Sequence, residues 1–268
     1  MWEGDVWVAV RAARAGADVV RWGFEEELAT EMKGVVDPVT QVDTEAEAAI
    51  TSVIRSHFPD DAILAEEGGG SDWRGRRVWI IDPLDGTVNF VNRIPQVAVS
   101  VALWDEGRPL VGVVIDVARQ EEFVAARGEG ATSNGHPIRV SDTAVLRDAL
   151  VATGFPYDRQ KHAGAYLAVL EQVMSRSRGM RRMGAAALDM AWVACGRFDG
   201  YWEHGGLAGV KPWDAAAGLL LVTEAGGTAT DSTGAVNELQ PAAFVVSNGK
   251  VHDELRQIVD DNMPPHLR

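Results

Sequence analysis

The chain has 268 residues, of which 46% are hydrophobic and 24% charged, and its formal net charge at pH 7 is −14. That length suffices for one large domain or two closely packed halves, and the negative charge argues against a general nucleic-acid-binding surface. The single cysteine, Cys195, excludes an intramolecular disulfide, and the sequence shows neither a signal peptide nor a membrane-spanning stretch, so we expect a cytoplasmic protein without membrane contacts.

The first half is predicted to begin with two helices. Apolar residues recur at helical spacing over 3–32, and a breaking segment that starts at Lys33 follows as a loop. A second helix is expected to start near Thr40 or Asp43 and to end at about His57. Apolar runs then predict strands over 78–81, 97–104, 110–117 and 121–126, with a hairpin at Gly107. A glycine-rich connection is expected to follow over 128–137.

The second half alternates between helices and strands. The predicted strands cover 149–153 and 243–247. The predicted helices cover 161–174, 184–197 and 215–224. Cys195 lies in the second of these helices, among small residues, where we expect it to pack in the interior. Alternation of this kind favours an α/β layered arrangement.

Two acids end an apolar strand in the most informative segment of the chain, residues 79–90. Asp82 and Asp85 follow the run Val78–Ile81, and Pro83 and Gly86 turn the backbone between and after them. Two such carboxylates would repel each other unless they shared a cation, and oxygen ligands of this kind suit Mg²⁺. The alternative is an acidic surface turn after a strand.

Two other acids stand in comparable positions. Glu66 follows the apolar run Ala62–Ala65, and Asp214 opens an alanine-rich helix. Taken alone, Glu66 is typical of surface decoration at a strand end, and Asp214 is typical of a helix N-cap. Thr87 and Asp43 also admit capping roles.

Together these segments resemble the inositol monophosphatase family. Asp82-Pro83-Leu84-Asp85-Gly86-Thr87-x-Asn89-Phe90 is similar to the first signature of that family. Trp213 to Gly218, followed by Glu224 to Gly227, is similar to the second. Asp37 to Thr40 with Asp43, and the pair Glu66-Glu67, match the acidic segments that precede the first signature. The resemblance implies a five-layer αβαβα sandwich of the α/β class. In it, an α+β half over 1–147 carries most metal ligands, and an α/β half over 148–268 carries Asp214 and the substrate rim.

The resemblance also implies the site and its cofactor, two or three Mg²⁺ ions. It places Glu66, Asp82 and the Leu84 carbonyl on a first ion, and Asp82, Asp85 and Asp214 on a second. It gives Glu66 and Thr87 the activation of water, with Asp43 polarising the threonine. The substrate contacts that it implies are Asp85, Gly86, Thr87, Arg182, Gly184, Ala185, Ala186, Glu203 and Asp214.

Two departures from the family pattern concern the substrate. Ala185 stands where a serine or threonine is common, and Glu203 and Asp214 are further apart than usual, with extra glycine-rich sequence between them. Among the histidines, which we expect at the surface or the pocket rim, only His204 is a candidate for the pocket.

The expected activity is Mg²⁺-dependent, lithium-sensitive hydrolysis of a small phosphorylated alcohol, most simply inositol 1-phosphate. Histidinol phosphate, fructose 1,6-bisphosphate, NADP and adenosine 3′,5′-bisphosphate are alternative substrates on the same fold. A non-catalytic binding protein is a more remote alternative. The resemblance further implies a homodimer.

Overall fold

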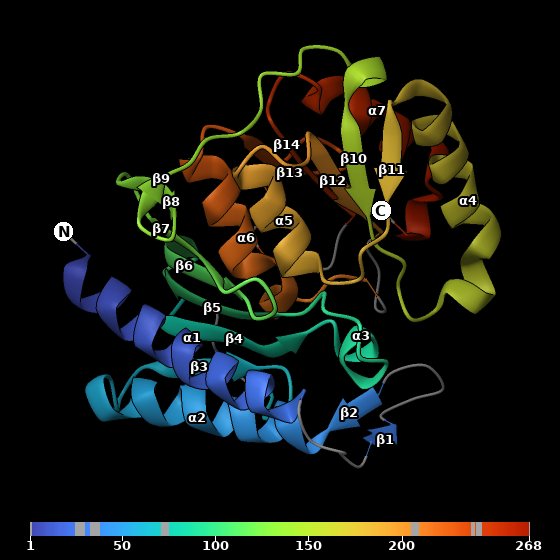
Figure 1. The fold of residues 1–268 in the computed structure, drawn as a ribbon. Coiled ribbons are helices and arrows are strands. Elements are labelled where there is room, and N and C mark those ends of the chain that lie inside the picture. The colour runs from blue at the N-terminus through green and yellow to red at the C-terminus, as the bar shows by residue number, and fades with distance from the viewer. Residues whose placement is uncertain are drawn as a thin grey trace.

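Five layers, in the order helix, sheet, helix, sheet, helix, make up the computed structural model (Figure 1). The structure describes residues 2–24, 30–32, 38–70, 75–204, 209–236, 239 and 243–267. The predicted loop that starts at Lys33, and residues 205–208 of the longer segment before Asp214, lie outside these ranges. The layered α/β fold agrees with the prediction.

The first outer layer consists of α1 (Glu3–Gly23) and α2 (Gln41–His57), which lie side by side on one face of the larger sheet (Figure 1). Each buries one apolar stripe, as the helical spacing predicts. The prediction of one helix over 3–32 was wrong at its end. The helix stops at Gly23, and Thr30–Met32 instead form β1, which pairs antiparallel with β2 (Pro38–Thr40).

The larger sheet has seven strands in chain order. β3 and β4 are parallel and the remaining neighbours are antiparallel. The predicted strands are confirmed, but the stretch 128–137 is not a plain connection, because it adds two short strands that extend the sheet. The seven are β3 (Ala62–Ala65), β4 (Val78–Asp85), β5 (Ala98–Asp105), β6 (Arg108–Asp116), β7 (Glu121–Ala126), β8 (Gly130–Ser133) and β9 (His136–Pro137).

The middle layer consists of α5 (Ala186–Ala194) and α6 (Pro212–Glu224), which lie between the two sheets (Figure 1). With a sheet on either side, these helices are apolar nearly all round rather than amphipathic. Small residues allow α6 to approach the larger sheet closely: a Cβ atom on Gly112 of β6 would lie 2.8 Å from the Ala217 carbonyl oxygen. The predicted helix over 184–197 was too long at both ends. Cys195 caps the C-terminus of α5 and is half-buried rather than fully interior.

The second sheet has five strands in the order β11-β10-β12-β14-β13, and α4 and α7 cover its outer face (Figure 1). β10 pairs in parallel with β11 and β12, whereas β14 pairs antiparallel with β12 and β13. Sequence analysis did not predict β11, β12, β13 or α7. The elements are β10 (Leu150–Thr153), α4 (Arg159–Arg176), β11 (Gly179–Arg181), β12 (Gly200–Glu203), β13 (Thr228–Asp231), β14 (Phe244–Ser247) and α7 (His252–Asn262), with 3₁₀ turns at Leu146–Asp148 and Pro265–Leu267.

All strands of the larger sheet precede residue 147, and those of the second sheet follow it. The middle helices come from the second half, yet they share one core cluster with the first sheet. The division into two domains at this point therefore stays a prediction. Within the described residues, no helix is both long and apolar enough to cross a bilayer.

Candidate active site

A β-bulge brings the two acids of the first motif to the same cavity. β4 pairs Asp82 with Ser100 of β5, but Asp85 with Ala98, so three steps on β4 match two on its neighbour. In a regular strand, residues three apart point to opposite faces, and one extra residue restores a common face. Both carboxylates consequently line one cavity of about 440 Å³. Sequence analysis predicted a turn here, and the structure shows a bulge within a buried strand.

Glu66 reaches this cavity from a turn after β3, the strand that lies parallel to β4. Glu47 of α2 fixes the turn, because its carboxylate accepts hydrogen bonds from the backbone N–H groups of Glu67 at 2.9 Å and Gly68 at 2.8 Å. The neighbouring Glu67 does not line the cavity. Glu47 was missed by sequence analysis, and its only signal there was an acid on the buried side of an amphipathic helix.

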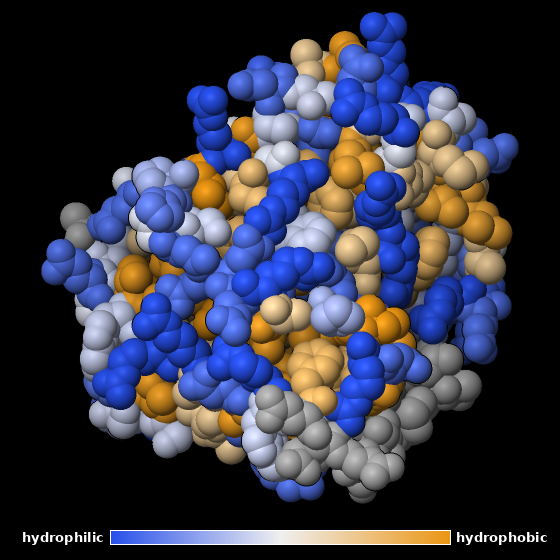
Figure 2. Space-filling model, in the orientation of Figure 1, coloured by the Kyte–Doolittle hydropathy of each residue, from blue (hydrophilic) through white to orange (hydrophobic). Residues whose placement is uncertain are grey.

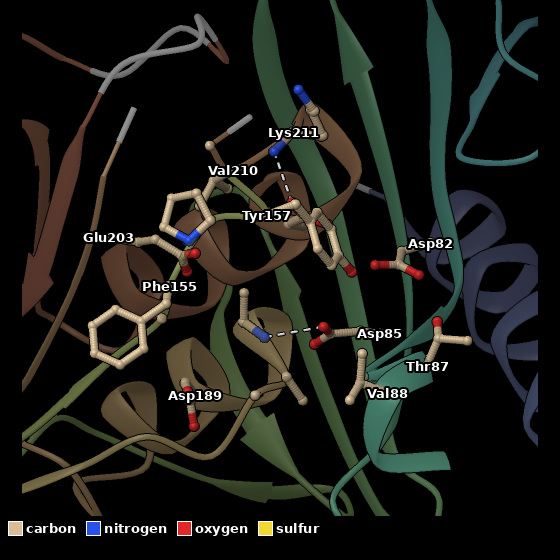
Figure 3. A pocket seen from close by; sticks show the side chains of 18 of the residues that line it. Asp82, Asp85, Thr87, Val88, Phe155, Tyr157, Asp189, Glu203, Val210 and Lys211 are labelled. Atoms are coloured by element: carbon tan, nitrogen blue, oxygen red, sulfur yellow. Dashed lines mark hydrogen bonds between the residues drawn. The ribbon is translucent and has the colours of Figure 1, made fainter. Parts of the chain in front are cut away.

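The second half of the chain holds Asp85 in place. Its carboxylate accepts hydrogen bonds from the backbone N–H groups of Ala186 at 3.0 Å, Ala187 at 2.8 Å and Leu188 at 3.4 Å (Figure 3). These groups belong to the first turn of α5, where backbone donors otherwise have no helical partner. The Ala186 N–H, which we predicted to contact substrate, is therefore engaged by Asp85.

Asp214 comes from the first turn of α6. It is the third helical residue, not the N-cap that its position suggested. Its carboxylate accepts a hydrogen bond from the backbone N–H of Lys211 at 2.7 Å, in a capping box, and Pro212 begins the helix. The carboxylate lines the same cavity as Asp82 and Asp85.

Burial and mutual repulsion make this cavity suited to cations. Burial, followed by the charges of Glu66, Asp85 and Asp214, holds the pKa of Asp82 well above its usual value. Burial raises the pKa of Asp85 to about 7, against the effect of its three N–H donors. Burial and nearby acids raise the pKa of Asp214 to about 8.

The available donors are carboxylate oxygens, which fit hard ions such as Mg²⁺. As the side chains stand, no three acids or histidines among the described residues converge tightly enough to enclose an ion.

The predicted pair Thr87 and Asp43 is brought together. The Thr87 hydroxyl lies 3.2 Å from Asp43 Oδ1 and 3.1 Å from the Leu84 carbonyl oxygen, and can donate to either. Thr87 begins α3 (Thr87–Val91), and Asp43 lies in the first turn of α2. Both side chains are buried, so this contact links the outer helix layer to the cavity.

The opposite wall of the cavity carries Glu203, at the end of β12 (Figure 3). Its carboxylate accepts a hydrogen bond from the Tyr201 hydroxyl, and burial raises its pKa to about 7. Gly154 makes room for it, because a Cβ atom there would lie 2.1 Å from Glu203 Oε2. Arg182, Gly184, Ala185 and Ala186 line the same cavity, together with Gly86.

Known proteins resemble this chain over nearly its whole length. A family model described as the inositol monophosphatase family matches residues 3–263. The chain belongs to the inositol monophosphatase family. The protein named Nus factor SuhB of Pseudomonas aeruginosa is 41% identical over 268 residues, covering 97% of each chain.

Two solved structures extend the comparison. An inositol monophosphatase from Anabaena has a TM-score of 0.87 and 38% identity, and the match covers 98% of this chain and 97% of that one. An inositol monophosphatase/NADP phosphatase in complex with Mg²⁺ and phosphate has a TM-score of 0.78 and 28% identity, with 90% and 89% covered.

The predictions for two histidines were wrong in this family member. His204 is fully buried and does not line the cavity. Its ring packs against those of Tyr166 and Trp202, with centroids 4.0 and 5.0 Å away, and burial lowers its pKa to about 3. His252, expected at the surface, is also buried and contacts Thr230 and Ser247.

Asn89 connects the two halves of the inositol monophosphatase fold beside the site. Its amide donates to the backbone carbonyls of Gln96 and Met183, both at 2.8 Å. It stands in the first signature, but sequence analysis gave it no role, because its partners are 7 and 94 residues away. A pattern in the local sequence does not show the contact between Asn89 and Met183.

Gly86 is the position where this site depends most on a missing side chain. Its φ is +95°, and a Cβ atom would lie 2.9 Å from the Gln96 carbonyl oxygen and 3.3 Å from that of Gly184. We expect Gly86→Ala to destabilise the protein by about 1–3 kcal/mol, since strain and a backbone clash add. Urea unfolding measures this.

Gly164→Ala is the matched control, because a Cβ atom there meets nothing within 4 Å. Equal unfolding midpoints for the two alanine variants would contradict the strain assigned to Gly86.

Proposed function

We propose that this chain is a Mg²⁺-dependent phosphatase of small phosphorylated alcohols, with inositol 1-phosphate as the first candidate substrate. The observation that carries the proposal is that Glu66, Asp82, Asp85 and Asp214 line one cavity, in which burial raises the pKa of all three aspartates. The related phosphatase complexed with Mg²⁺ and phosphate supports it.

Glu66, Asp82, Asp85, Asp214 and the Leu84 carbonyl would hold two or three ions. Bound Mg²⁺ supplies positive charge against phosphate oxygens and acidifies water. This matters in a chain of net charge −14, because the protein itself would repel a phosphate monoester at long range.

The residues of the chain would orient the reaction. Thr87 can donate its hydroxyl hydrogen bond to Asp43 or to the Leu84 carbonyl oxygen, which leaves the hydroxyl oxygen free to accept a hydrogen bond from the attacking water. Glu66, at the cavity wall, would take the proton that this water loses. Gly86, Gly184 and Ala185 line the space that the substrate would occupy, and Arg182 and Glu203 bound its alcohol side.

A substrate panel tests the proposal. Phosphate release would be measured with Mg²⁺ for inositol 1-phosphate, histidinol phosphate, fructose 1,6-bisphosphate, NADP and adenosine 3′,5′-bisphosphate. The highest kcat/KM identifies the substrate class. Absence of release from all five substrates would refute the phosphatase proposal.

Such an absence would favour the second candidate, a non-catalytic binding protein. The name Nus factor, which the Pseudomonas aeruginosa relative carries, is the observation in its favour. Retention of all four acids in the cavity favours catalysis instead. We also propose a cytoplasmic location, which a single unpaired thiol supports.

Lithium should inhibit the enzyme at millimolar concentration. A small monovalent cation can occupy the carboxylate cluster but supplies less charge than Mg²⁺. Phosphate release at saturating substrate, measured against added LiCl with KCl at the same ionic strength as control, checks this. Identical curves for the two salts would contradict it.

A homodimer remains our expectation for the assembly. α5, one candidate for its interface, is buried between the sheets and is excluded. Exposed apolar side chains lie instead on α4, with Leu167 56% and Met174 61% exposed, where Figure 2 shows apolar surface. Light scattering should give twice the chain mass of 28.9 kDa. A value equal to the chain mass at micromolar concentration would exclude the dimer.

A further inference from the structure

One carboxylate in the cavity has no role in the proposed chemistry. Asp189 lies on α5, is 1% exposed, and lines the cavity with the metal-binding acids. Its Oδ1 atom makes no hydrogen bond to any residue that the structure describes. A buried carboxylate oxygen without a hydrogen-bond partner costs stability, and a hydrogen bond from a bound ligand would offset that cost.

Asp189 belongs to the wall opposite the metal-binding acids. In Figure 3 it lies on the same side of the cavity as Glu203, and Asp82 and Thr87 lie on the other. Asp189, Tyr201 and Glu203 all line this cavity, and burial, followed by the charges of Glu203 and Asp189, holds the pKa of the Tyr201 hydroxyl well above its usual value. Tyr201 donates its hydrogen bond to Glu203, and none to Asp189.

We propose that Asp189 is a specificity-determining residue that accepts a hydrogen bond from a hydroxyl group of the alcohol part of the substrate, beside Glu203. This inference rests on the proposed phosphatase function and names the substrate class as polyol phosphates. Two neighbouring acceptors suit two neighbouring hydroxyl groups, and a polyol offers such a pair.

The charge of the wall favours a neutral polyol over an amino alcohol. Arg182 lines the same cavity, and its charge lowers the pKa of both Asp189 and Glu203, against the larger effect of burial. It therefore already supplies a positive charge near both acids. Because burial raises the pKa of both acids, they carry less than their full negative charge near pH 7, so a substrate ammonium group would meet repulsion from Arg182 without two full carboxylate charges to offset it. Hydroxyl groups meet no such repulsion.

Kinetics of Asp189→Ala and Asp189→Asn on two substrates test the proposal. For inositol 1-phosphate, the alanine variant should raise KM about five- to tenfold with kcat nearly unchanged, as expected for one lost hydrogen bond. The asparagine variant keeps an acceptor oxygen and should restore most of the loss. Phenyl phosphate, which lacks hydroxyl groups, should be hydrolysed equally by all three proteins.

A structural role for Asp189 gives a different pattern. It predicts a lower unfolding temperature and equal losses on both substrates, and that result would overturn the proposal. The proposal instead predicts no loss of unfolding temperature for Asp189→Asn, because the substitution keeps the shape of the side chain and removes a buried ionisable group whose pKa burial raises. Unchanged KM for inositol 1-phosphate in Asp189→Ala would also overturn it.

Two further measurements distinguish failure of the role proposed for Asp189 from failure of the polyol assignment or of the phosphatase proposal. Phosphoethanolamine, a cationic substrate, should be no better than phenyl phosphate, and a preference for it that both variants abolish would contradict the polyol assignment. If the wild type shows no turnover, the phosphatase proposal fails. Calorimetric binding of inositol 1-phosphate then tests the contact with Asp189 separately. Weaker binding to Asp189→Ala than to the wild type supports the contact, and equal or absent binding overturns it.

Discussion

Asp82→Asn is expected to lower kcat for phosphate release by about a thousandfold or more, equivalent to roughly 4 kcal/mol of transition-state stabilisation. The asparagine keeps the acceptor for the backbone N–H of Leu84, which lies 3.0 Å from Asp82 Oδ1. It removes the charge that the family pattern assigns to both ions. Because that charge is repelled by neighbouring acids, the metal-free variant should unfold at the same temperature as the wild type or higher. Stopped assays of phosphate release and thermal unfolding measure the two effects.

Asp105→Asn is the matched control. It is the same substitution, at the end of β5, outside the cavity. It should leave kcat within about twofold, as surface changes usually do. If Asp82→Asn retained wild-type kcat with the control also active, Asp82 would not be a metal ligand.

Adding Mg²⁺ should raise the unfolding temperature, and more at pH 8 than at pH 5. Buried Asp85 and Asp214 have folded-state pKa values of about 7 and about 8. In the unfolded chain these values are near 4, so the folded metal-free protein binds more protons between about pH 4 and pH 8. Its stability is therefore greatest at the acidic end of this window and falls as pH rises through it.

The stabilisation by Mg²⁺ increases as pH rises, because Mg²⁺ competes with protons for these carboxylates. At a concentration about a hundred times its dissociation constant it contributes about 2.7 kcal/mol, or roughly 5–10 °C for a chain of this size. Calorimetry with EDTA and with Mg²⁺ across this range checks both slopes, and Asp82→Asn is the variant that should lose the response. A Mg²⁺ effect that was equal at pH 5 and pH 8 would contradict the coupling of protons and ions at these carboxylates.

The parts of the fold that could be predicted depend on local patterns. Apolar runs correctly predicted the long strands of the larger sheet, and the helix expected from near Thr40 or Asp43 to about His57 is α2. The end of α1 was missed because residues 24–32 remain helix-compatible in spacing, whereas β1 forms by pairing with β2. α7 was overlooked, although His252, Leu255, Ile258 and Val259 repeat at helical spacing on its buried side.

In the site, too, local patterns predicted some features, and contacts between distant segments determine the others. The acids of the two signatures could be named from their order in the sequence, and the structure brings them to one cavity. The bulge that makes Asp82 and Asp85 share a face depends on pairing with β5, and no property of residues 82–85 alone reveals it. Asp189 sits in an apolar helix that lies between two sheets, so its lack of a partner becomes visible only once both neighbouring layers are placed.

The shared middle layer also has a consequence for how the chain folds during synthesis. Seven strands are complete once residue 137 has been made, but α6, which covers their inner face, ends only at Glu224. Until then the emerging chain presents an apolar sheet surface with nothing packed against it. Contacts such as that of Gly112 with Ala217 join distant parts of the sequence, which slows folding and prolongs this exposure. The nascent first half is therefore the stage at which this protein is most open to aggregation and most dependent on chaperones.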